Sequence, residues 1–379
     1  MKLKNLLPVL FGFFIMGFCD IVGVATSYVK TEFALSESLA GLIPSMVFLW
    51  FLILSVPTSL LCRKFGRRKM VIAGNVITMI GMMIPLLLFT FPACLTAFAL
   101  LGIGNTILQV SLNPLLTDVV DGKALSSSLT AGQVIKAVSS FSGPFIVTFA
   151  VAAWGDWKMM FPVFAVLSVL SAAWLAMTPI KEKAETGSTS VKSVFALVND
   201  KFILMLFMGI VCIVGVDVGI NTLAPKILME RCNLPMTEAG FGSSVYFFCR
   251  VAGAFIGTVL LAKISDRKYY ISHLIIGLAV IASMFAVKDS KLVLMILLGA
   301  AGYAFSSIFS VIYSQALKHL PEKADEISGL MITGVFGGAL VPPLMGVFSD
   351  MTGSQTGSII VIAAFALYLL VCGLKLKKA

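Results

Sequence analysis

The sequence predicts an all-α integral membrane protein with twelve transmembrane helices. Of its 379 residues, 59% are hydrophobic and 12% are charged, whereas soluble domains carry about 25% charged residues. The apolar residues gather in runs near the roughly 20 residues that a helix needs to cross a bilayer. These runs cover residues 6–29, 38–62, 70–90, 93–116, 126–152, 159–178, 202–225, 239–262, 271–287, 292–316, 325–349 and 356–374.

The basic residues between the spans predict the orientation of the chain. Counted between alternate spans, one side carries 20 Lys and Arg, the other side carries 6, and 2 lie inside spans, which accounts for all 28. The richer side, which holds both termini, is expected to be cytoplasmic. We therefore expect a multi-pass protein of the bacterial cytoplasmic (inner) membrane. The net charge of +10 follows from this topology. The sequence has no basic domain with interleaved aromatic residues, so we expect no nucleic-acid partner.

The first span carries one ionisable residue near its middle, Asp20. A carboxylate at that depth costs roughly 2.5–3.5 kcal/mol on insertion scales. It is therefore expected to face a cavity, a partner charge or an ion.

The fourth and fifth spans carry polar faces. Asn105, Gln109 and Asn113 recur every four residues and so share one face of a helix. Amides both donate and accept hydrogen bonds, which suits sugar hydroxyls, although bonding between helices is an alternative for each of them. The fifth span places a second polar set on a common face: Gln133, Lys136 and Ser140.

A polar stretch of linker composition divides the chain into six spans and six spans. We expect an N-terminal six-helix bundle over 1–180, a cytoplasmic linker over 181–201 and a C-terminal six-helix bundle over 202–379.

The seventh and eighth spans repeat the pattern of a charge at depth. Asp217 and Asn221 lie one turn apart, and Tyr246 lies one turn before Arg250. Together with Asp20 and Lys136, Asp217 and Arg250 make two acids and two bases. Their charges balance, which predicts ion pairs, with Asp20–Lys136 expected within the N-terminal half. Static salt bridges between helices are one interpretation. The other interpretation is a substrate or ion path, which charges inside the membrane favour.

The two halves resemble each other, as expected for internal repeats. Gly102–Val120 lies opposite Gly302–Leu320, and Gly143-Pro144 lies opposite Pro342-Pro343. In addition, residues 62–69, which include Gly66-Arg67-Arg68, resemble the loop motif of the major facilitator superfamily. Arg63 stands where that motif has an aspartate.

Several stretches resemble the fucose:proton symporter branch of that superfamily. They are 108–114 in the fourth span, 130–144 in the fifth, 214–222 in the seventh, 238–257 in the eighth and 337–350 in the eleventh. The resemblance implies two pseudo-symmetric six-helix bundles and a sugar transporter driven by an ion gradient, with proton symport in the family.

The chain departs from this branch at the coupling residues. The fourth-span glutamate of the family is Gln109 here, and its fifth-span asparagine is Lys136. Asp20 and Asp217 are then the carboxylates left at depth, and we expect them to couple transport to a proton or to sodium. The expected substrate-binding residues are Asn105, Gln109, Asn113, Gln133, Lys136, Asn221, Tyr246 and Arg250.

These observations predict a secondary active transporter, expected to be a monomer, that moves a sugar or a related small polar solute by alternating access. An organic anion bound by Lys136 and Arg250, an uncoupled facilitator and a non-transporting receptor are the alternatives. The sequence contains no G-x-x-x-x-G-K-[ST] motif for ATP. We found no nucleophile with a base and no metal cluster within the spans, so we expect neither an enzyme nor a cofactor.

Overall fold

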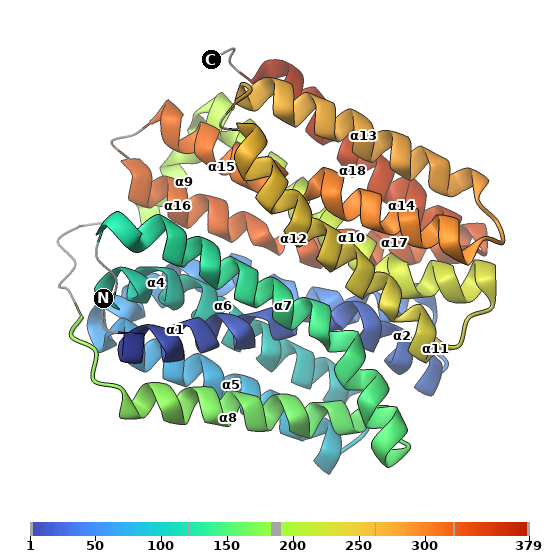
Figure 1. The fold of residues 1–379 in the computed structure, drawn as a ribbon, viewed down its shortest axis with the longest axis horizontal. Coiled ribbons are helices and arrows are strands. Elements are labelled where there is room, and N and C mark those ends of the chain that lie inside the picture. The colour runs from blue at the N-terminus through green and yellow to red at the C-terminus, as the bar shows by residue number, and fades with distance from the viewer. Residues whose placement is uncertain (1–2, 120–121, 183–190, 262, 321–322, 377–379) are drawn as a thin grey trace. The chain divides into compact units, whose positions relative to one another are not determined.

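The computed structural model describes residues 3–119, 122–182, 191–261, 263–320 and 323–376. These residues form α-helices and short 3-10 helices joined by turns, with no strand among them (Figure 1). Twelve helical segments are long and apolar enough to cross a membrane, and each overlaps one of the predicted spans. The predicted fold class is therefore confirmed.

The first six spans are built from eight α-helices. Their bounds are α1 Leu3–Met16, α2 Val22–Glu32, α3 Glu37–Ala40, α4 Leu42–Phe65, α5 Arg67–Leu87, α6 Phe91–Val119, α7 Gly122–Trp154 and α8 Met160–Met177. Two 3-10 helices accompany them, η1 Gly17–Ile21 and η2 Trp157–Met159. The turn before α5 is made by Gly66, whose φ of 89° a side chain would disfavour.

The second six spans follow a similar sequence of elements. Their helices are α9 Val191–Ala196, α10 Lys201–Cys232, α11 Met236–Ala239, α12 Phe241–Leu261, α13 Asp266–Ala286, α14 Lys291–Phe305, α15 Ile308–His319, α16 Ala324–Thr333, α17 Gly337–Thr352 and α18 Thr356–Lys375. The 3-10 helices here are η3 Leu197–Asn199 and η5 Gly334–Phe336. Asp200 caps α10 by accepting hydrogen bonds from the N–H groups of Phe202 and Ile203, at 2.8 and 3.1 Å.

The chain divides into two compact units. The first contains Met1–Ile21 and Leu49–Ser188, and the second contains Val22–Phe48 and Thr189–Ala379. The C-terminal part of the first span and the start of the second therefore belong to the unit that holds the last six spans. The predicted bundle boundaries at 180 and 202 stay a prediction, and linker residues 183–190 lie outside the described residues.

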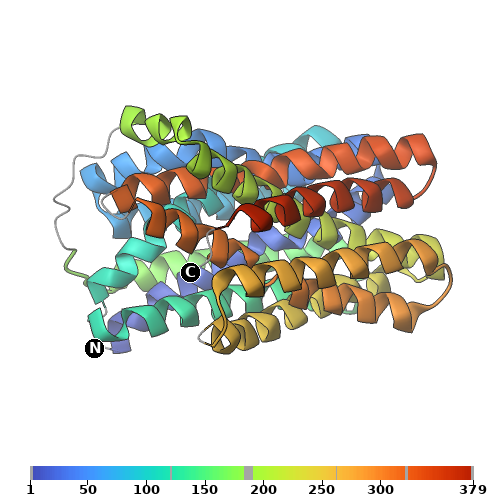
Figure 2. The ribbon, with the colours of Figure 1, turned by 90° about the horizontal axis from the view of Figure 1, so that it is seen from above.

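Matching helices have matching neighbours in the two units. In the first unit α5 packs on α6 and α8, and α1 packs on α7. In the second unit α13 packs on α14 and α18, and α10 packs on α17. Figure 2 shows α17 and α18 running side by side in the second unit. The internal repeat read from the sequence thus has a counterpart in the packing of each unit.

Among the described residues, three spans are interrupted in a way that hydropathy does not reveal, in addition to the single turns at Gly41 and Gly240 near the start of the second and eighth spans. The first is broken by η1, the tenth at Ser306 and Ser307, and the eleventh by η5. A break frees backbone carbonyls, which must find partners at membrane depth. At η1 the carbonyl oxygen of Met16 accepts a hydrogen bond from Nδ2 of Asn105 at 2.6 Å.

Candidate functional site

Three of the predicted site residues meet at mid-span in the second unit. Nη1 of Arg250, on α12, lies 2.9 Å from Oδ2 of Asp217, on α10. The hydroxyl of Tyr246 donates a short hydrogen bond to Oδ1 of the same carboxylate. The prediction that Arg250 compensates Asp217 is confirmed. The side chains keep 32% and 16% of their surface exposed, so this ion pair is only partly buried.

Close helix packing fixes the part of α12 that carries Tyr246 and Arg250. A Cβ atom added at Gly302, on α14, would lie 2.2 Å from the carbonyl oxygen of Tyr246 and 3.2 Å from the amide nitrogen of Arg250. Only glycine permits this approach of the two backbones. The position of the two site residues therefore depends on α14.

Asn221 lies one turn beyond Asp217 on α10 and is almost fully buried, at 2% exposure. Its backbone carbonyl accepts a hydrogen bond from Ser243 at 3.2 Å. A Cβ at Gly23, on α2, would lie 2.3 Å from Oδ1 of Asn221. The side chain of Asn221 is therefore packed directly against α2, which is a structural role whatever else it does.

The second acid, Asp20, lies in η1 of the first unit. Its Oδ2 accepts a hydrogen bond from Oγ of Ser140 at 2.6 Å, and that hydroxyl oxygen lies 3.1 Å from the carbonyl oxygen of Lys136. Asp20 therefore contacts α7 one turn from Lys136. The Asp20–Lys136 ion pair stays a prediction.

The three amides of α6 form a ladder along one face, as their spacing predicted. Nε2 of Gln109 donates to Oδ1 of Asn105 at 3.0 Å, and Nδ2 of Asn113 lies 3.4 Å from the carbonyl oxygen of Gln109. Asn105 is 1% exposed and bonds to the broken first span, so it holds helices together. The buried Oδ1 of Asn113 accepts no hydrogen bond from the described residues.

The predicted residues thus fall into two groups, one in each unit. Gln133, on α7 with Lys136, is exposed. Among the described residues, no three His, Cys, Asp or Glu side chains are grouped to hold a metal ion.

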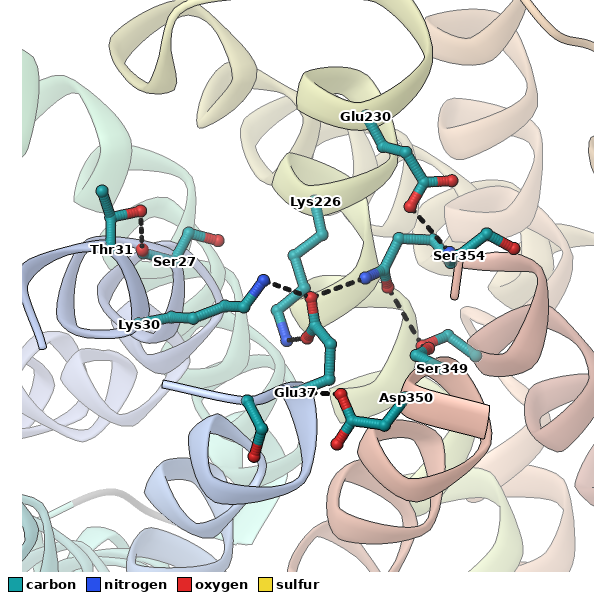
Figure 3. A network of polar contacts seen from close by, with 12 residues as sticks. Ser27, Lys30, Thr31, Glu37, Lys226, Glu230, Ser349, Asp350 and Ser354 are labelled. Atoms are coloured by element: carbon teal, nitrogen blue, oxygen red, sulfur yellow. Dashed lines mark hydrogen bonds and ion pairs between the residues drawn. The ribbon is translucent and has the colours of Figure 1, made fainter. Parts of the chain in front are cut away.

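The structure also shows a polar network that the sequence pattern did not indicate. Figure 3 shows Lys30 and Lys226 approaching the carboxylate of Glu37 from two helices. The seventh apolar run ends at residue 225, which placed Lys226 outside the predicted span. The available signal was the apolar stretch that follows Lys226, Ile227-Leu228-Met229. In the structure α10 continues past Pro225 to Cys232, which places Lys226 inside the helix.

The fold and its polar groups at membrane depth are those of a multi-pass transporter, and the sequence matches one family. The chain belongs to the Major Facilitator Superfamily, whose profile matches residues 9–343 and 219–378.

Individual relatives and solved structures resemble the chain over most of its length. It is 24% identical over 371 residues to a glucose/galactose transporter of Brucella abortus, covering 93% of this chain and 90% of the relative. It is 21% identical over 378 residues to the L-fucose-proton symporter of Escherichia coli, covering 89% and 85%. The crystal structure of the nucleoside transporter NupG superimposes with a TM-score of 0.81 at 14% identity, covering 100% of both chains. At that identity the likeness shows the fold alone.

Proposed function

We propose that this protein is a secondary active transporter that moves a sugar or a related small polar solute by alternating access. The observation that carries the proposal is the cluster of Asp217, Tyr246 and Arg250 at mid-span. Charged side chains that remain partly exposed at membrane depth mark a water-filled path, because exposure to lipid would cost several kcal/mol. The relatives named as glucose/galactose and L-fucose transporters support a sugar as the solute.

A neutral solute fits this cluster better than an anion. The charge of Arg250 is balanced by Asp217 at 2.9 Å, so an anionic solute would have to compete with a carboxylate that is part of the protein. Hydroxyl groups can instead bond to the exposed edges of the pair. We infer that each unit contributes solute-binding residues: Asn105, Gln109, Asn113, Gln133 and Lys136 in the first, and Asn221, Tyr246 and Arg250 in the second.

Coupling to a cation gradient is assigned to the two acids at depth, Asp20 and Asp217. The relative named as a proton symporter supports a proton, and a carboxylate can also hold sodium. We propose that the protein acts as a monomer in the bacterial cytoplasmic membrane with both termini in the cytoplasm. In this proposal the two halves, 1–180 and 202–379, are the two repeats of an alternating-access transporter.

Uptake into proteoliposomes tests the proposal. Radiolabelled glucose, galactose and fucose are offered separately, each with an imposed proton gradient, an imposed sodium gradient or neither. We expect one of the sugars to accumulate above its external concentration with only one of the two cation gradients. Equilibration without accumulation would indicate a facilitator, and no uptake of any sugar by folded protein would contradict a sugar transporter.

A further inference from the structure

The short helix α3 lies directly on α17 within the second unit. A Cβ at Gly346, on α17, would be 2.4 Å from the carbonyl oxygen of Glu37, and one at Gly41 would be 2.8 Å from that of Pro342. The two backbones therefore touch without interlocking side chains at these points. The two helices can therefore separate at these points without moving large side chains past one another.

A carboxylate holds the beginning of α3 in this position. Oδ1 and Oδ2 of Asp350, near the end of α17, accept hydrogen bonds at 2.9 Å from the backbone N–H groups of Glu37 and Ser38 respectively. The hydroxyl of Ser38 donates a further short hydrogen bond to Asp350. A negative charge is favourable at the N-terminal end of a helix, where unbonded N–H groups point outward.

The side chain of Glu37 is contacted by three donors, two in helices and one directly before a helix. Nζ of Lys30 (α2) lies 2.7 Å from its Oε1, and Nζ of Lys226 (α10) lies 2.5 Å from its Oε2. Nε2 of Gln355, directly before α18, donates to Oε1 at 2.8 Å. The Glu37 side chain is only 12% exposed. Neutralising it would leave the ammonium group of Lys226 buried without its carboxylate partner.

A polar cavity of about 350 Å³ lies beside these ion pairs. It contains a second carboxylate, Glu230, whose Oε2 accepts a hydrogen bond from the backbone N–H of Gln355 at 2.7 Å. The lining residues are Ser27, Lys30, Thr31, Glu37, Lys226, Met229, Glu230 and Gln355. Water and charged side chains can occupy this space when the ion pairs rearrange.

The matching place in the second repeat is different. There the first residue of α11, Met236, takes the position of Glu37. The acid of α11, Glu238, stands two residues further on and pairs with Lys291 at 2.9 Å, but the two side chains are 50% and 52% exposed. A surface pair of this kind contributes little to stability. The buried, multiply bonded carboxylate is therefore a feature of Glu37 and does not follow from the repeat itself.

We propose that Glu37, Lys30, Lys226 and Asp350 form a latch that closes one end of the solute path, the end away from the termini. The inference rests on the alternating-access function proposed above. Glu37 and Lys30 precede the central linker, whereas Lys226, Asp350 and Gln355 follow it. When the two halves rock to open this end, α3 must leave α17, and the Glu37–Lys226 pair must break. The strength of these contacts then sets how often the end opens.

Cysteine labelling tests the latch without any solute. Ser27, which lines the cavity and is 2% exposed, is replaced by cysteine in a chain that also carries Cys232→Ser. A membrane-impermeant maleimide is added outside intact cells. We expect slow labelling in this parent and a rate at least about tenfold higher with Glu37→Gln, because loss of a buried partner shifts such an equilibrium by that much or more. Asp350→Asn should also raise the rate.

The control is Glu238→Gln, which removes the surface acid of α11, the equivalent short helix of the second repeat, and should leave the labelling rate unchanged. Size-exclusion chromatography establishes that each variant is folded, and Asp350→Asn decides the matter if Glu37→Gln does not fold. Unchanged labelling in the folded variants would overturn the latch, and so would labelling of the Ser27→Cys thiol only from the cytoplasmic side. Sugar uptake by the parent is measured separately, so failure of the latch and failure of the proposed function are distinguishable.

Discussion

At the scale of residues, the two acids and two bases at membrane depth were readable from the sequence, but the pairing of Asp217 with Arg250 and its contact with Tyr246 were not. Spacing placed Tyr246 one turn before Arg250, and the structure shows that the Tyr246 hydroxyl bonds to Asp217. Ser140 was placed on the polar face of the fifth span, and the structure shows it bonded to Asp20 at 2.6 Å. Side-chain partners such as these depend on which helices are adjacent, which one helix's periodicity does not encode.

Removal of Arg250 tests the energetic role of the pair. Arg250→Ala leaves the Asp217 carboxylate without its cation, and we expect a loss of about 2 kcal/mol of stability, below the roughly 3–5 kcal/mol of a fully buried pair. The double variant with Asp217→Asn should be more stable than Arg250→Ala alone. Thermal unfolding in detergent measures both, with Lys291→Ala at the exposed pair as a control of near-zero effect. Additive losses would contradict the coupling.

Removal of the Asp20 charge tests energy coupling. Asp20→Asn keeps the size of the side chain and can still accept the hydrogen bond from Ser140, but it cannot exchange a proton. We expect labelled sugar to exchange across the membrane while accumulation against a gradient is lost. Accumulation by Asp20→Asn and by Asp217→Asn at the level of the parent would show that neither carboxylate is individually required.

At the scale of elements, the spans were predictable because length and hydropathy determine them, whereas their interruptions were not. The break at η1 is stabilised by Asn105 from a different helix, so no local pattern in residues 17–21 predicts it. Close contacts between helices have the same origin. Gly302 allows α14 to approach α12 closely, because the backbone of Tyr246 lies where a side chain at this position would be.

Gly302→Ala tests how far α14 positions the site. The added methyl would collide with the carbonyl of Tyr246, and we expect a loss of about 1–3 kcal/mol from overpacking together with weaker sugar binding. Gly329→Ala is the matched control, because its Cβ would find no atom closer than 3.7 Å. That variant should be neutral or slightly stabilising, since alanine favours helix over glycine. Equal melting temperatures of the two variants would contradict the close contact.

At the scale of the whole molecule, the asymmetry of the basic residues predicts which side faces the cytoplasm. Ser188, in the part of the linker outside the described residues, is replaced by cysteine to report it. We expect a membrane-impermeant reagent to label this variant in inside-out vesicles and not in intact cells. Labelling from outside intact cells would reverse the orientation and, with it, the side assigned to the latch.

The twelve spans, the internal repeat and the residues that carry charge at depth could all be read from the amino-acid sequence. These features follow from hydropathy, spacing and the cost of burying a carboxylate or an ammonium group. Which charges meet depends on the tertiary fold. It joins Arg250 to Asp217 within the second unit and brings together the Glu37–Lys226 pair, whose members stand 189 residues apart. Contacts over such separations arise from the packing of helices, which the sequence of either helix alone does not specify.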